Sequence, residues 1–109
     1  MRVIPTVMDM SKSGHRLVTV NFEIFGKVQG VYFRKCTAKQ ARTLGLKGYC
    51  MNTDRGTVQG TIQGADNRVA EMKNWLKEVG SPASRIDKAV FSSEQEISKL
   101  QSGSFTIRQ

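Results

Sequence analysis

Apolar and polar side chains alternate over Leu17–Phe25, and the apolar positions are Val18, Val20, Phe22 and Ile24. A period of two predicts a strand with one buried face. From Phe33 the apolar and small positions recur at helical spacing, and Gly45 stands where such a helix would end. The pattern therefore predicts a strand followed by a helix.

Two further strands are predicted next, over Leu46–Asn52 and Thr57–Gln63, with hairpin-turn residues between them. A regular apolar stripe then predicts a second helix that ends at Gly80, with Asp66 or Asn67 as its N-cap residue. A last full strand is predicted over Ile86–Phe91, and the short segment Phe105–Arg108 is expected to pair at a sheet edge.

The order strand, helix, strand, strand, helix, strand predicts an α+β fold. It is the ferredoxin-like split βαβ sandwich (βαββαβ), in which two helices cover one face of an antiparallel sheet. We expect one such domain over residues 17–109, after a loose N-terminal leader at residues 1–16. Because many unrelated functions use this fold, the chemistry must be argued from a site.

Charge and composition narrow the classes of partner. The chain has 17 Lys and Arg against nine Asp and Glu, a formal net charge of +8, which attracts anions. One histidine, His15, and no paired ligand spacing argue against a metal, and no apolar run is long enough to insert into a membrane. Two cysteines form no disulfide framework, so we expect a reducing, cytoplasmic location.

The stretch FGKVQGVYFRK, from Phe25 to Lys35, carries the candidate chemistry. Gly26 and Gly30 bracket a polar loop that leads from the first strand into the first helix, whose first N–H groups have no partner within the helix. The N–H groups from Gln29 to Phe33 are predicted to converge on one phosphate, and Arg34 to offer two donors to it. An ordinary turn with a solvated arginine is the alternative.

Two better-known phosphate motifs are excluded. The stretch lacks the spacing and the Lys-Ser/Thr ending of a nucleotide-binding P-loop. Cys36 and Arg42 have the Cys-x5-Arg spacing of tyrosine phosphatases, but inside a helix that spacing separates them by about 240°. We therefore do not expect Cys36 to be a nucleophile.

Four stretches, taken in order, resemble the acylphosphatase family: GKVQGVYFRK, GLKGYCMNTDRGTVQGTIQG, WLKEVGSPASRID and SFTIRQ. The resemblance covers about Val20 to Arg108. It departs from the family pattern at Tyr49, where tryptophan is common, and in the leader.

The resemblance implies a small cytosolic hydrolase of carboxyl-phosphate anhydrides that is monomeric and needs no cofactor. It implies that Arg34 binds the phosphate and that Asn52 orients the attacking water, while Thr53 and Thr57 support the hairpin. The implied phosphate cradle consists of Gly26, Gln29, Gly30, Val31, Tyr32 and Phe33, together with Arg34.

The implied partners are small acyl phosphates, inorganic phosphate and the aspartyl-phosphate of ion pumps. Two other functions are compatible with the fold. An RNA-recognition module would need an aromatic Lys/Arg-Gly-Phe/Tyr-type strand, which the sequence lacks, so specific nucleic-acid binding is not expected. A phosphate sensor would bind phosphate without turnover.

Overall fold

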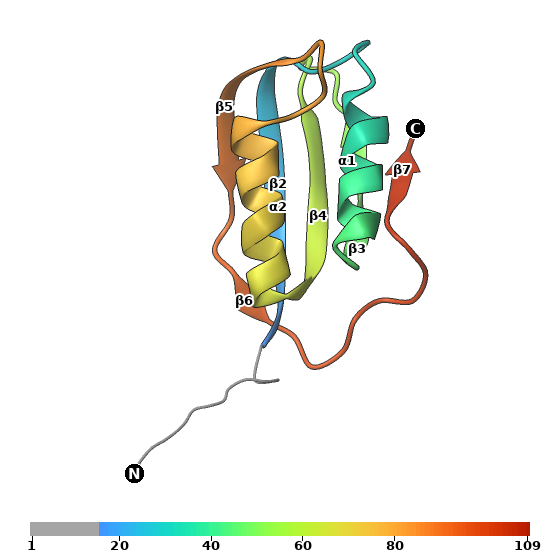
Figure 1. Ribbon diagram of the computed structural model, residues 1–109, viewed down its shortest axis with the longest axis vertical. Helices are drawn as coiled ribbons and strands as arrows, with labels where there is room; N and C mark the ends of the chain where they lie inside the picture. Colours follow the sequence, from blue (N-terminus) through green and yellow to red (C-terminus); the bar gives the residue numbers. More distant parts are fainter. Residues whose placement is uncertain (1–15) are drawn as a thin grey trace.

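The computed structural model describes residues 16–109. Its elements follow one another as β2 (Leu17–Lys27), α1 (Phe33–Thr43), β3 (Lys47–Asn52), β4 (Val58–Ala65), α2 (Asp66–Glu78), β5 (Arg85–Phe91), β6 (Gln95–Glu96) and β7 (Thr106–Arg108). The strands form one sheet in the order β5-β2-β4-β3-β7, and β6 pairs with β2. The two helices lie on the same face of this sheet (Figure 1). The predicted ferredoxin-like α+β arrangement is confirmed.

The core lies between the two helices and the sheet. In β2 the side chains of Val18, Val20, Phe22 and Ile24 are buried, as the alternating pattern predicts. The helices close this layer with the buried residues Phe33, Ala38 and Ala41 of α1 and Val69, Met72 and Leu76 of α2. Burial of this apolar area from water is the main force that holds the helices on the sheet.

Four details differ from the sequence-based expectations. β7 runs parallel to β3, so the sheet is mixed and not purely antiparallel. The two-residue strand β6 was not predicted, because two residues carry no periodicity. α2 begins at Asp66 with Ala65 as its N-cap residue, so the prediction that Asp66 or Asn67 caps this helix is wrong. The first strand extends to Lys27 and includes Gly26.

The predicted leader at residues 1–16 lies, apart from Arg16, outside the described residues. The carbonyl of Arg16 accepts a hydrogen bond from the N–H of Asp66, at 2.9 Å. The boundary of the domain at residue 17 stays a prediction.

Candidate active site

Three connections meet at one end of the sheet, at the top of Figure 1. They join β2 to α1 (residues 28–32), β3 to β4 (residues 53–57) and α2 to β5 (residues 79–84). The predicted phosphate loop is the first of them, and Asn52 ends β3 just before the second. The ends of the strands therefore bring the predicted site residues to the same end of the molecule.

The loop enters α1 through two residues with left-handed backbone conformations. Gly30 has a φ of 73° and Tyr32, the N-cap residue of α1, has a φ of 60°. The first helical hydrogen bond runs from the N–H of Cys36 to the carbonyl of Tyr32, at 3.0 Å, so the N–H groups of the preceding turn have no acceptor within the helix. No acidic residue occupies that turn. This helix end is electrostatically suited to an anion.

Gly26 lies outside this loop. It sits in β2, at a bulge in the pairing with β5, with a φ of 133°. A Cβ atom at this position would lie 2.1 Å from the carbonyl oxygen of Arg85. Gly26 therefore permits the close approach of β2 and β5, and it lies in the strand and not in the loop that leads into α1.

Arg34 lines a pocket of about 570 Å³ at the N-terminus of α1, which we call the phosphate pocket. Gly30, Tyr32 and Phe33 of the predicted cradle line it too, together with Val28, Lys35, Ile107 and Gln109. The Nη1 atom of Arg34 lies 3.5 Å from the carbonyl oxygen of Arg108 in β7, and this weak contact is the hydrogen bond that its guanidinium donates within residues 16–109. The structure thus gathers half of the predicted cradle around the guanidinium group.

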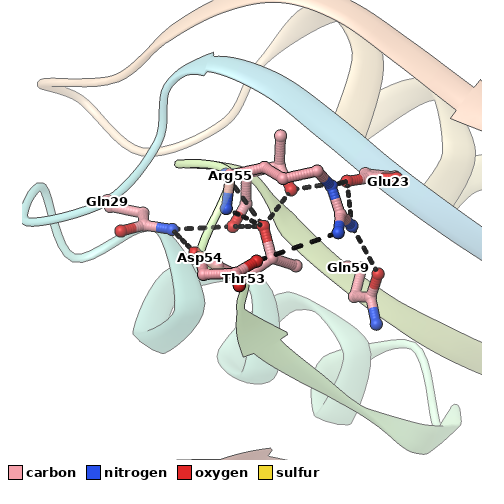
Figure 2. Close-up of polar contacts among 7 residues, drawn as sticks. Glu23, Gln29, Thr53, Asp54, Arg55 and Gln59 are labelled. Carbon is pink, nitrogen blue, oxygen red and sulfur yellow. Dashed lines mark hydrogen bonds and ion pairs between the residues drawn. The ribbon is translucent and has the colours of Figure 1, made fainter.

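Two predicted cradle residues, Val31 and Gln29, form hydrogen bonds that connect the loop to neighbouring segments. Val31 is buried, and its carbonyl accepts a hydrogen bond from the Oγ of Ser81, at 2.9 Å. Gln29 directs its side chain at the hairpin, where Nε2 donates to the carbonyls of Thr53 and Thr57 at 2.8 and 2.9 Å. Figure 2 shows this bridge from the loop to the hairpin. The bridge holds the phosphate loop and the end of β3 in a fixed relation.

The hairpin is fastened in turn to β2. The hydroxyls of Thr53 and Thr57 are 2.5 Å apart, and Thr57 donates a hydrogen bond to Glu23 at 2.6 Å. Arg55 forms an ion pair with the same carboxylate, and its Nη2 atom lies 2.8 Å from Oε2 of Glu23 (Figure 2). These hydrogen bonds are compatible with the supporting role predicted for the two threonines, which stays a prediction.

Sequence reasoning missed Glu23 and Arg55. The pairing of β2 with β4 sets Glu23 opposite Gln59, two residues after Thr57, so a strand-pairing argument would have found the contact. The hydrogen bond from Thr57, and then the one from Arg55, lower the pKa of Glu23 below its ordinary value of 4.5, against the opposing effect of burial. The carboxylate is therefore ionised at neutral pH.

The Glu23→Gln variant is expected to be less stable than the native protein at pH 7. A lowered folded pKa means that the carboxylate contributes stability above its ordinary pKa and loses that contribution as the pH falls through the folded value. Thermal unfolding from pH 7 down to about pH 3 should therefore show the difference in Tm between the two proteins shrinking. A difference in Tm that stays constant with pH would contradict the interpretation that Thr57 and Arg55 stabilise the ionised carboxylate of Glu23.

Asn52 carries the most unusual polar atom of the site. Its Oδ1 is buried and accepts no hydrogen bond from any group in residues 16–109. A buried acceptor without a partner costs free energy, and a catalytic role or a bound water is among the explanations for such an atom. The register of the sheet sets Asn52 opposite Val58, directly beside the hairpin that Gln29 holds.

The cysteines offer no obvious nucleophile. Burial raises the pKa of Cys50 to about 12, in spite of the nearby Arg34 and Arg42, so this thiol stays protonated. Cys36 lies in α1, as expected. Within residues 16–109 no three metal-binding side chains come together, and no helix there is long and apolar enough to cross a membrane.

Comparisons with known proteins point to one family. The acylphosphatase family model matches residues 20–107. The chain is 50% identical to acylphosphatase-2 of Gallus gallus, over 91% of this chain and 96% of the relative. It is 53% identical to acylphosphatase-1 of Homo sapiens, over 86% of this chain and 95% of the relative.

Among solved structures, an acylphosphatase from Coxiella burnetii superposes with a TM-score of 0.75 at 26% identity, covering 89% of this chain and all of that one. The family model extends from β2 to β7 and includes α1, which carries Arg34, and β3, which ends at Asn52. The chain belongs to the acylphosphatase family of hydrolases.

Proposed function

We propose that this protein hydrolyses acyl phosphates by direct attack of water on the phosphorus. The observation that carries the proposal is the phosphate pocket, where Arg34 and the free N–H groups at the start of α1 face one space. The guanidinium fork and the N–H groups bind the phosphate oxygens and stabilise the charge that they carry in the transition state.

Asn52 supplies the orientation of the water. Its partnerless Oδ1 accepts a hydrogen bond from one O–H of the water. This hydrogen bond orients the water so that a lone pair of its oxygen faces the phosphorus. The water oxygen forms a bond to phosphorus while the bond from phosphorus to the acyl oxygen breaks, and the carboxylate leaves with the electron pair. Because an amide cannot take up the water proton, that proton passes to an oxygen of the substrate's own phosphate.

The chemistry of the leaving group explains why Arg34, Asn52 and the backbone N–H groups are enough for catalysis. A carboxylate has a conjugate acid with a pKa of about 4, so it departs without protonation. Two carboxylates lie at the hairpin. Glu23 is bound by Thr57 and Arg55, the exposed Asp54 pairs with Arg55, and neither carboxylate lines the phosphate pocket. The site therefore needs neither a general acid nor a general base from the protein.

Ordinary phosphate esters should be poor substrates, because their alkoxide leaving groups need an acid that the pocket lacks. We expect benzoyl phosphate to be hydrolysed with a kcat/KM at least about a thousandfold above that for serine phosphate. Parallel assays with both compounds, with and without chelator, test this expectation. Comparable rates on the two substrates would refute the proposed mechanism.

Two alternative functions make different predictions. A phosphate sensor would bind inorganic phosphate at Arg34 and hydrolyse neither compound. An RNA-recognition module would offer free aromatic rings on the open face of the sheet, but Phe22 is buried and the guanidinium of Arg108 lies 3.7 Å from the ring centroid of Tyr49. The covered ring of Tyr49 favours the enzyme over the RNA-binding module.

The remaining expectations stay proposals. We propose that the protein acts as a cytoplasmic monomer on small acyl phosphates. Action on the aspartyl-phosphate of ion pumps is a further prediction from the resemblance, and it calls for a substrate carried by another protein.

A further inference from the structure

A second hollow adjoins the phosphate pocket. It measures about 620 Å³, within the range of about 300–1,000 Å³ typical of small-molecule sites. It runs along α1 and is closed on the other side by the connection from α2 to β5, and we call it the α1 groove. Tyr32 and Lys35 line both the α1 groove and the phosphate pocket, so the two hollows lie side by side.

The wall of the α1 groove is apolar near the phosphate pocket. The exposed Pro82 and Ala83 and the largely buried Val31 contribute aliphatic groups, and Tyr32 contributes an aromatic ring. The backbone of Tyr32 is in the left-handed region, at a φ of 60°, and the residue is 77% exposed. A bulky residue in that conformation is uncommon, and here it places an exposed ring between the two spaces.

The rim of the α1 groove is basic. Lys35 and Lys39 are exposed, lie four residues apart on α1 and line the groove, and neither forms an ion pair within residues 16–109. Arg42, farther along, is already engaged, because its Nε and Nη2 atoms donate to the carbonyl of Phe105 at 3.0 and 2.8 Å. The two lysines are therefore the groups available to an anionic ligand.

We propose that the α1 groove binds the acyl group of the substrate and favours acyl phosphates with an apolar carbon skeleton that ends in a second anionic group. This inference rests on the proposed function, because the phosphate must first bind beside Arg34. With the phosphate at the N-terminus of α1, the skeleton passes Tyr32 onto the apolar wall, and the distal anion reaches Lys39. Complementary charge gives selectivity here, and the apolar wall gives contact area.

The test compares kcat/KM for acetyl, benzoyl and 4-carboxybenzoyl phosphate, which add first the apolar ring and then the distal anion. The native protein should prefer 4-carboxybenzoyl over benzoyl, and benzoyl over acetyl phosphate. In Lys39→Glu the ratio of kcat/KM for 4-carboxybenzoyl to that for acetyl phosphate should fall about tenfold, because an attractive charge becomes repulsive. The matched control Lys77→Glu, an equal charge change on exposed α2 surface, should leave this ratio within about twofold.

A second variant tests the apolar wall. Ala83→Trp places a large side chain in the groove from an exposed turn, so it should lower the ratio for benzoyl over acetyl phosphate while the protein still folds. Equal ratios in Lys39→Glu and Lys77→Glu, or an unchanged benzoyl ratio in Ala83→Trp, would overturn the assignment of the groove. If the native protein hydrolyses none of the three compounds, the proposed function itself fails, and the inference fails with it.

Discussion

Arg34→Ala is expected to lower kcat/KM for benzoyl phosphate by about a thousandfold or more and to weaken the binding of inorganic phosphate by at least about tenfold. Arg34 and Lys35 both line the phosphate pocket beside the free N–H groups of α1, and of these two side chains the guanidinium of Arg34 offers two donors in one plane to the phosphate oxygens. Both the bound phosphate and the transition state lose their strongest donor in the variant. Steady-state kinetics and calorimetric titration with phosphate measure the two effects.

Arg68→Ala is the matched control. It removes the same charge from exposed surface of α2, where Arg68 pairs only with Glu71 among the ion pairs of residues 16–109. Its kinetics should stay within about twofold of the native values. If Arg34→Ala kept native phosphate affinity, or if Arg68→Ala lost as much activity, the assignment of Arg34 to the phosphate would be wrong.

Asn52→Ala is expected to lower kcat by about a hundredfold to a thousandfold and to leave phosphate affinity nearly unchanged. The reason is that Oδ1 has no hydrogen bond within residues 16–109 and, on the proposed mechanism, contacts the water and not the phosphate. Stability should be unchanged or higher, since removal of a buried partnerless acceptor also removes the cost of its desolvation.

Thermal unfolding and phosphate titration of Asn52→Ala separate this role from a structural one. Asn74→Ala on the exposed surface of α2 provides the control for the same side-chain truncation. A large loss of phosphate affinity in Asn52→Ala, or a large fall in its Tm, would place the side chain in the cradle or in the structural framework instead.

Local patterns of apolar and polar residues were sufficient to predict most of the helices and strands. The alternation in β2 and the helical spacing from Phe33 are properties of neighbouring residues, and the structure places both elements where they were predicted. The misplaced cap of α2 has a local reason too, because Ala65 continues β4 directly into the helix and leaves no turn for a capping side chain. The parallel direction of β7 depends on the course of the long connection after β5, which carries no periodic signal.

The contacts that organise the site are mostly long-range, and for that reason the sequence did not reveal them. Gln29 was predicted to contribute its backbone N–H, whereas its side chain bridges to carbonyls 24 and 28 residues away. Glu23 meets Arg55 and Thr57 only because β2 pairs with β4. Arg34 was recognisable because its position in the first turn of a helix after a glycine-containing loop is a local feature.

The central claim is that water attacks the phosphorus held beside Arg34. Hydrolysis of benzoyl phosphate in water enriched in oxygen-18, followed by mass spectrometry of both products, tests it most directly. The account predicts that the label enters inorganic phosphate and that benzoate carries none, because the bond from phosphorus to the acyl oxygen breaks. Label in benzoate would mean that water attacks the acyl carbon, and the roles proposed for Arg34 and Asn52 would then be wrong.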